Sequence, residues 1–500
     1  MRDKKLLLNT TTSLFNQIVV IICGFILPRC FLVTYGSEVN GLITSITQFL
    51  GFISLMDLGI SAVVKASLYT PLAQKNKKNI SLIMISAKRF YKKIIIIFLI
   101  YLFFLCLLYP LRVNNDFDWL YTVSLILAMS ISLIAQYYFG IVNQTLIDAD
   151  QKIYINSLLN SFTLILNTIC SVVLMMSFNA SIQFVKLTTS LIYVIRPIYL
   201  MIYVKKHYDI DYSYKLTSEP IKQKWNGILQ HVASVVLQNT DVFILTLFST
   251  LKNVSIYNVY SLVVLGIKNL VVSLTSGMQS KMGNLLAKEN YQELNDFFSK
   301  TEFFLHSIIT LSFTATAVLI VPFVKVYTSG INDANYDVPL FGLLITIAQM
   351  FYCLRLPYSQ IVLAAGHFKE TQGSALIEML LNIFISVILV WNFGLNGVAI
   401  GTVISMAYRT IYYVFYISKH IIQRPIHYYV KHMCTDIAVF ILSILVCQAF
   451  TINNLSYLCW IILAVKVCLV VAIIFIIVNY ITYGNIIKKY LKALIYHRKQ

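Results

Sequence analysis

The sequence predicts an all-α integral membrane protein with about fourteen membrane-spanning helices, and composition and patterning are the basis for this class. Hydrophobic residues make up 58% of the 500 residues and charged residues 12%, and the mean hydropathy is +0.76. Soluble domains carry roughly twice that share of charge. The apolar residues form runs long enough to cross a bilayer, and most charged residues lie between the runs. We therefore expect no sizeable soluble domain.

The first apolar run begins after Arg2, Lys4 and Lys5 and is too long for a signal peptide. It has no small-residue cleavage site, so we expect it to be the first span. Each later run is close to the roughly 20 residues that a bilayer requires. The predicted spans cover about 7–33, 40–64, 94–113, 118–142, 155–178, 184–204, 226–249, 254–279, 302–327, 338–365, 373–392, 395–418, 433–452 and 455–483.

The basic residues of the connecting segments test this set of spans. Most of them fall on the side of the membrane that holds the N-terminus. The opposite side holds only Arg29, Arg112, Lys186, Lys252 and Lys325. Because cytoplasmic loops are rich in Lys and Arg, we expect both termini in the cytoplasm. The net charge of +19 is then mainly a topology signal, and nucleic acid is not an expected partner.

An internal repeat relates the two halves of the chain and places Arg196 opposite Arg409. The aligned fragments are 192–208 with 405–421, 71–76 with 285–290, and 143–150 with 359–366. Each copy holds an even number of spans, so both copies insert in the same orientation. Parallel repeats of this kind place a binding site between the halves, near the middle of the membrane.

The repeat predicts a division of the chain into four parts. Residues 1–204 form a six-helix N-lobe, residues 205–224 a cytoplasmic linker, and residues 225–420 a six-helix C-lobe. Residues 421–500 hold two further helices and a basic cytoplasmic tail. The segments predicted to lie outside the cell are short, so we expect no external catalytic domain.

Charged residues inside the predicted spans are the candidates for function. Each costs about 2.5–3.5 kcal/mol at a helix centre, so such residues are expected to face protein or water. The candidates for lining a substrate cavity are Arg196, Arg409, Lys268, Arg355, Asp57, Asp241, Lys65 and Arg29. Bases outnumber acids among these spans, and the excess favours an anionic substrate, phosphate above all. The alternative is mutual salt bridging within the bundle, which would make the charges structural.

Some of these charges have a simpler explanation. Arg29, Lys65 and Glu378 lie near predicted span boundaries, where a long side chain reaches the interface. Lys466 lies in one of the two extra spans, and we expect it to be structural or interfacial. The remaining candidates are the stronger ones for a cavity.

The sequence contains no motif for catalysis. The nine cysteines lie in or beside apolar runs without CxxC spacing, and the eight histidines lack metal-ligand spacing. Motifs for ATP hydrolysis or covalent catalysis are also missing. We therefore expect no enzyme, no cofactor and no metal site. A membrane-embedded polysaccharide polymerase is a weaker alternative, because such enzymes usually need a substantial outer loop with catalytic residues.

Four stretches carry a resemblance to a known family: YGSEVNG at 35–41, DLG at 57–59, DADQK at 148–152 and NTDVFIL at 239–245. With these residues the chain resembles the Wzx-type polysaccharide flippases of the multidrug/oligosaccharidyl-lipid/polysaccharide exporter superfamily. The resemblance implies a MATE-like V of two lobes around a central cavity that opens alternately to each side. It also implies export of a polyprenyl-pyrophosphate-linked oligosaccharide across the bacterial cytoplasmic membrane for surface polysaccharide assembly.

The expected mechanism follows from both lines of reasoning. Arginines and lysines hold the pyrophosphate, the sugars occupy a polar cavity, and the prenyl tail stays in lipid. Asp57 and Asp241 orient the basic groups or bind a coupling cation, either sodium or a proton. Other expected partners are membrane lipid and a polysaccharide polymerase. The alternative is a cation-coupled multidrug exporter of the same superfamily, for which an acidic cavity would be expected.

Overall fold

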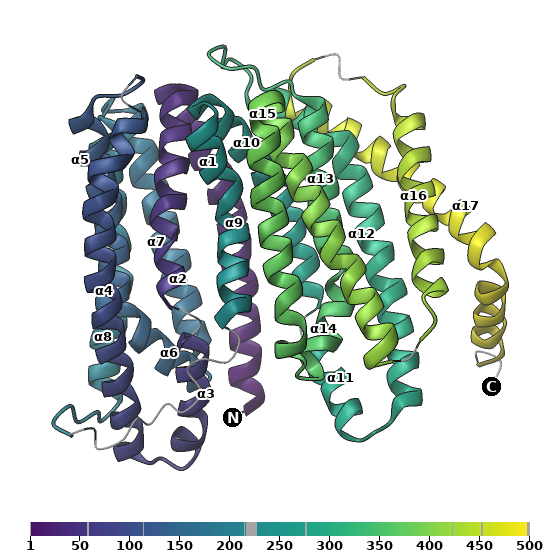
Figure 1. Cartoon of the computed structure of the whole chain (residues 1–500), viewed down its shortest axis with the longest axis horizontal. Coiled ribbons are helices and arrows are strands. Elements are labelled where there is room, and N and C mark those ends of the chain that lie inside the picture. The colour runs from purple at the N-terminus through teal and green to yellow at the C-terminus, as the bar shows by residue number, and fades with distance from the viewer. Residues whose placement is uncertain are drawn as a thin grey trace. The chain divides into compact units, whose positions relative to one another are not determined.

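The computed structural model describes residues 2–57, 60–113, 115–214, 216, 228–275, 278–422, 424–451 and 454–497. Every regular element within these ranges is a helix (Figure 1). A helix satisfies its backbone N–H and C=O groups internally, which is what a chain inside a bilayer requires. The prediction of an all-α membrane protein is confirmed.

The chain forms two compact units, unit 1 from Met1 to Ser255 and unit 2 from Ile256 to Gln500. Unit 1 contains α1 (Arg2–Gly51), α2 (Ile53–Asp57), α3 (Ile60–Ala73), α4 (Lys77–Val113), α5 (Trp119–Ala135), the π-helix η1 (Gln136–Gly140), α6 (Ile141–Ala149), α7 (Ile153–Met176), α8 (Ile182–His207) and α9 (Ile228–Phe248). Unit 2 contains α11 (Met278–Ala287), α12 (Tyr291–Tyr327), α13 (Pro339–Leu354), α14 (Leu356–Ala364), α15 (Phe368–His420), α16 (His427–Cys447) and α17 (Tyr457–His497). The boundary falls within α10 (Leu251–Leu274).

The boundary between the units differs from the predicted division of the chain. The sequence places that division at the linker 205–224, whereas α9 packs with α1 and α2 in unit 1. The assignment of residues 1–204 and 225–420 to two transporting lobes stays a prediction. Residues 215 and 217–224 of the linker lie outside the described residues, as do the last two residues of the DLG stretch.

Twelve helical segments among the described residues are long and apolar enough to cross a membrane. One of them, α15, is a hairpin, because Asn382 bonds Thr402 and the Ser386 hydroxyl donates to the Val398 carbonyl across its two halves. Gly394 makes the turn with φ of 52°. The described chain therefore has twelve spanning segments, or thirteen with the hairpin divided. The predicted count of about fourteen is higher because 7–33 and the first part of 40–64 also lie within one element.

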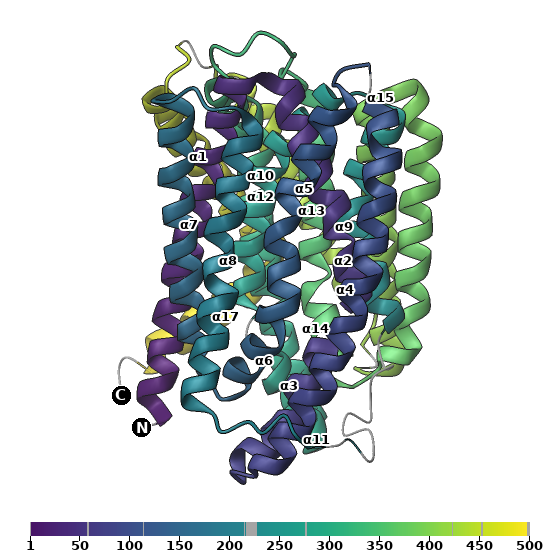
Figure 2. The ribbon, with the colours of Figure 1, turned by 90° about the vertical axis from the view of Figure 1, so that its left-hand side faces the viewer.

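That element, α1, has non-helical backbone at Gly36, where φ is 83°. The part before Gly36 packs along α7, which Figure 2 shows beside it. The part after Gly36 packs along α9, where Ser45 and Thr246 share a hydrogen bond of 2.7 Å. Small residues permit close approach here, since a Cβ at Gly41 would overlap the carbonyl oxygen of Leu251.

The side-chain distribution is that of a protein in lipid. Large apolar side chains are exposed along the helices, such as Phe103 on α4 and Ile476 on α17, which are 62% and 64% exposed. Soluble proteins rarely expose extended apolar faces. Small polar residues are buried between helices, and Tyr109 donates to Ser45 at 2.8 Å in unit 1. Such bonds hold helices together where no hydrophobic effect between them exists.

The repeated sequence fragments take matching places in the two units. Fragment 143–150 lies in and just after α6, and fragment 359–366 lies in and just after α14. Each of these nine-residue helices follows an interruption, the π-helix η1 in one case and the break at Arg355 in the other. α3 and α11 likewise each end two residues before a residue with positive φ, Lys75 and Glu289.

Candidate functional site

Three of the predicted cavity residues meet in unit 2, in what we call the Glu378 cluster: Glu378, Arg355, Arg409, Lys268 and Tyr352. Arg355 Nη1 donates to Glu378 Oε1 at 2.5 Å, and Arg409 Nη1 donates to Oε2 at 2.6 Å. Glu378 is 1% exposed and each arginine 6%. The Lys268 ammonium lies 3.9 Å from the centre of the Tyr352 ring, and the Arg355 guanidinium lies 4.5 Å from it.

The backbone explains how this cluster forms. Arg355 occupies the break between α13 and α14, and Glu378 and Arg409 lie on opposite halves of the α15 hairpin. The two arginines use both oxygens of the carboxylate, so their geometry is that of a buried ion-pair network. Lys268 has a cation–π contact, and within the described residues no carboxylate pairs with it. Three bases around one carboxylate leave a surplus of positive charge.

A second cluster lies in unit 1 around Arg196, and its partners are neutral amides. Arg196 Nη1 donates to Asn160 Oδ1 at 3.2 Å, and Nη2 donates to Gln144 Oε1 at 3.1 Å. Gln136 donates to the same Gln144 oxygen at 3.0 Å, and Asn160 donates to Asn16 at 2.9 Å. We call these five residues the Arg196 amide cluster. Gln136 comes from the π-helix η1, a kind of helix that is frequent at functional sites.

An acidic residue absent from the sequence candidates joins this cluster. Asp148 interacts electrostatically with both Lys65 and Arg196, and Asn156 donates to its Oδ1 at 2.6 Å. The structure therefore brings two of the predicted cavity residues, Lys65 and Arg196, to one carboxylate. Asp148 lies in the DADQK stretch that carries the family resemblance, and this stretch is the sequence signal that could have identified it.

Arg196 and Arg409 are equivalent in the repeat but differ in their partners. Arg409 faces the carboxylate of Glu378, which neutralises much of its charge. Arg196 donates its hydrogen bonds to uncharged amide oxygens, and it shares the nearby Asp148 carboxylate with Lys65. Because its direct hydrogen bonds go to neutral groups and two bases share Asp148, Arg196 keeps more of its attraction for an anion and is the stronger anion-binding candidate of the two.

The other predicted residues lie elsewhere in the fold. Asp57 ends α2, and Tyr91 donates to its Oδ1 at 2.5 Å. Asp241 is buried in α9, and Arg29 is half-buried in α1. Lys466 is exposed on α17. Whether any of the predicted residues binds substrate stays a prediction.

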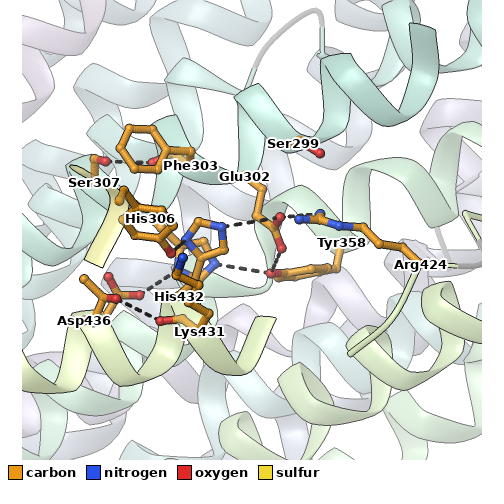
Figure 3. A network of polar contacts seen from close by, with 12 residues as sticks. Ser299, Glu302, Phe303, His306, Ser307, Tyr358, Arg424, Lys431, His432 and Asp436 are labelled. Atoms are coloured by element: carbon orange, nitrogen blue, oxygen red, sulfur yellow. Dashed lines mark hydrogen bonds and ion pairs between the residues drawn. The ribbon is translucent and has the colours of Figure 1, made fainter. Parts of the chain in front are cut away.

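Sequence reasoning missed a buried polar network in the described part of unit 2 (Figure 3). It joins α12, α14, α16, α17 and the segment before α16, and we call it the Glu302 network. Its members are Glu302, His306, Thr310, Tyr358, Arg424, His432, Asp436 and Tyr483. Arg424 Nη1 pairs with Glu302 Oε2 at 2.5 Å, and Thr310 donates to Asp436 at 2.7 Å.

A helical spacing in the sequence was the available signal for this network. Glu302, His306 and Thr310 are four residues apart on α12, and His432 and Asp436 are four apart on α16, so each set lies on one helix face. The first set was overlooked because the predicted span 302–327 begins at Glu302, which put this residue at the end of the span. The actual helix begins at Tyr291, so Glu302 lies well inside it.

Long apolar helices with buried charge clusters define a multi-pass membrane protein. No protein-family model matches the chain, and no curated protein matches it. Its structure is similar to one described as lipid II flippase MurJ in an inward closed conformation, over 96% of this chain and 100% of that one. The TM-score of this pair is 0.74 at 17% sequence identity.

Two MATE structures are also similar at lower TM-scores. An inward-facing multidrug resistance MATE family transporter of the MOP superfamily has a TM-score of 0.53 at 14% identity, over 81% of this chain and 96% of that one. The Vibrio cholerae MATE transporter VcmN in its bent form has a TM-score of 0.52 at 14% identity, over 83% and 96%. The chain therefore shares the fold of these MurJ and MATE structures.

Proposed function

We propose that this protein is a flippase that moves a lipid-linked saccharide across the bacterial cytoplasmic membrane for surface polysaccharide assembly. The substrate that we propose is a polyprenyl-pyrophosphate-linked oligosaccharide. The observation that carries the proposal is the likeness to a lipid II flippase along the full length of both chains. The MATE structures cover a smaller share of this chain, 81% and 83%.

The chemistry of the buried clusters supports an anionic headgroup as cargo. A guanidinium is a planar fork that binds phosphate oxygens bidentately. Arg196 offers such a fork in unit 1. The amides around it, Gln136, Gln144 and Asn160, carry both donors and acceptors, which suits the hydroxyl groups of a sugar. The surplus positive charge of the Glu378 cluster favours the same class of substrate.

The topology that we propose follows from Gly36. If α1 divides there as α15 divides at Gly394, the chain has the predicted count of about fourteen spans. An even count returns the C-terminus to the side of the N-terminus, which the distribution of Lys and Arg assigns to the cytoplasm. Alternating access then moves the cargo, and the cargo biases the cycle only through its different affinity for the two states.

A multidrug exporter is the second candidate, and the likeness to MATE transporters favours it. Organic cations would require acidic groups facing the cargo. Bases outnumber acids in both clusters: three bases surround Glu378, and Arg196 and Lys65 share Asp148. This balance of charge is why we place the exporter second.

Reconstituted vesicles test the proposal. The full-length protein is placed in liposomes with a fluorescent polyprenyl-pyrophosphate-linked saccharide, and a membrane-impermeant quencher reports its movement between leaflets. We expect wild-type protein to accelerate this movement. Arg196→Gln removes charge-assisted hydrogen bonds worth about 1.5–3 kcal/mol each, so flipping should slow by about tenfold or more.

Arg112→Gln is the matched control, because Arg112 is exposed and donates only to the Leu247 and Ser249 carbonyls at a helix end. It should leave the flipping rate within about twofold of wild type. Wild-type vesicles that export ethidium but leave the labelled saccharide in place would overturn the flippase assignment in favour of the multidrug exporter.

A further inference from the structure

His306, at the centre of the Glu302 network, has a partner at each ring nitrogen (Figure 3). Nδ1 lies 2.6 Å from Asp436 Oδ2, and Nε2 lies 3.3 Å from the Tyr358 hydroxyl. That hydroxyl has one proton, which it donates to Glu302 Oε1 at 2.6 Å. Its oxygen therefore accepts a hydrogen bond from Nε2, while Asp436 accepts one from Nδ1. A histidine that donates from both nitrogens is an imidazolium, so the geometry places a proton on His306.

The charges of the network lead to the same result. Two carboxylates, Glu302 and Asp436, share the network with one guanidinium, that of Arg424. A protonated His306 completes the balance. Glu302, His306 and Asp436 are 1%, 2% and 4% exposed, and an unbalanced charge at that depth is costly. The network is therefore neutral with one proton bound and negative once that proton has left.

The other titratable and charged groups around His306 fit this assignment. His432 lies with its ring centre 5.1 Å from that of His306, so a second imidazolium there would be repelled. Its Nε2 faces Glu302 Oε2 at 3.7 Å, and its Nδ1 bonds the Tyr483 hydroxyl at 2.8 Å. The remaining neighbours are Tyr429, whose ring meets His306 edge-on, and Lys431, whose ammonium lies over Tyr483.

A short relay connects His306 with a pocket. The Nε2 proton passes to the Tyr358 oxygen while the Tyr358 hydroxyl proton passes to Glu302 Oε1. His306 and Glu302 are then both neutral, and no other bond has changed. Glu302 and Arg424 line a pocket with about 20 Å³ of free space, which holds roughly one water molecule. The Arg424 side chain is 16% exposed, so the relay ends near the surface of unit 2.

The relay is also joined to the Glu378 cluster through one short helix. Tyr358 lies on α14, and Arg355 lies directly before α14, about one turn away. Loss of the Nε2 proton removes the hydrogen bond from His306 to the Tyr358 oxygen, which is one of the contacts that hold α14 in place. Arg355, and with it the pairing of Glu378, would then respond to the protonation of His306.

We propose that His306, Tyr358 and Glu302 form a proton-binding relay that couples the transport cycle to the proton gradient. The inference rests on the proposed transporter function for its coupling step only. The proton site itself depends on the geometry of unit 2 and is measurable without any cargo.

Solid-state ¹⁵N spectra of histidine-labelled full-length protein in lipid test the proton site. An ordinary histidine has a pKa near 6.5, so an imidazolium that persists at pH 8 marks a histidine held in its charged form. We expect one imidazolium signal to persist at pH 8 in wild type and to vanish in His306→Gln. It should persist in His367→Gln, because the His367 ring bonds the Tyr416 hydroxyl at 2.8 Å outside the network. A wild-type spectrum without an imidazolium at pH 8 would overturn the proposal.

The vesicle assay with the labelled polyprenyl-pyrophosphate saccharide tests the coupling. We expect an imposed pH gradient to change the wild-type flipping rate at least about fivefold, a free-energy change of about 1 kcal/mol. Tyr358→Phe keeps the aromatic packing but removes the relay hydroxyl, so it should lose this response, whereas His367→Gln should retain it. A wild type that flips at one rate with and without the gradient would overturn the coupling while leaving the flippase function intact. If wild type moves no saccharide, the flippase function fails, and the ¹⁵N spectra alone decide on the proton site.

Discussion

Replacing Glu378 by glutamine is the most direct test of how the buried charges are held. Glu378 is 1% exposed and pairs with Arg355 through one oxygen and with Arg409 through the other. The glutamine side chain has nearly the same shape, so packing is kept and only the negative charge is removed. Two guanidinium groups and the Lys268 ammonium would then face one another without a carboxylate between them.

The structure sets the size of the effect. Removing one partner of a buried ion pair costs about 3–5 kcal/mol, because the other charge is left buried and uncompensated. Glu378 serves two arginines, so the upper part of that range applies. At roughly 2 °C per kcal/mol for a unit of this size, the thermal midpoint should fall by about 8–10 °C. Adding Arg355→Gln to the variant removes one uncompensated charge and should recover part of the loss.

The assay is thermal unfolding of the purified protein in detergent, followed by intrinsic fluorescence. Glu370→Gln is the matched control, because Glu370 lies on the same helix at an exposed position. We expect it to shift the midpoint by less than about 2 °C. A Glu378→Gln midpoint equal to that of the control would refute the ion-pair description of the cluster. A fall in the midpoint of the double variant that exceeds the sum of the falls in the two single variants would refute it as well.

Two further predictions concern packing and topology. Gly397→Ala should destabilise the α15 hairpin by about 1–3 kcal/mol, because the new Cβ would overlap the Leu389 carbonyl, whereas Gly373→Ala on the same helix meets nothing within 4 Å and should be tolerated. Thermal midpoints of the two variants decide this, and equal values would contradict it. A protease-sensitive tag placed before Arg2 should be protected in intact spheroplasts, and a tag in segment 177–181 should be cleaved, since the excess of Lys and Arg predicts a cytoplasmic N-terminus. Cleavage of the N-terminal tag in intact spheroplasts would contradict the predicted cytoplasmic location of the N-terminus.

Helix boundaries show where hydropathy stops being informative. The predicted span 94–113 is the apolar end of α4, which begins at Lys77, and the span 302–327 is the apolar end of α12, which begins at Tyr291. Hydropathy detects the part of a helix that lipid surrounds. It does not detect the turns that continue into water, because polar residues there are compatible with either a helix or a loop. Glu302 was overlooked because the predicted span begins at it, and His306 because the histidines were considered only for metal-ligand spacing.

Composition and periodicity by themselves determined that this chain is an all-α membrane protein with a repeated order of helices. Each apolar segment must avoid water and must satisfy its own backbone hydrogen bonds in lipid, and both requirements can be recognised from that segment alone. They also identified most of the buried bases, since a charge inside an apolar run is visible in the sequence.

Only the tertiary structure decided the partners of those bases. Arg196 and Arg409 occupy equivalent repeat positions, yet one meets amides and the other a carboxylate. His306 and Asp436 lie 130 residues apart and form one ion pair. Such pairings depend on which helix faces pack together, and no local pattern in the sequence contains that information.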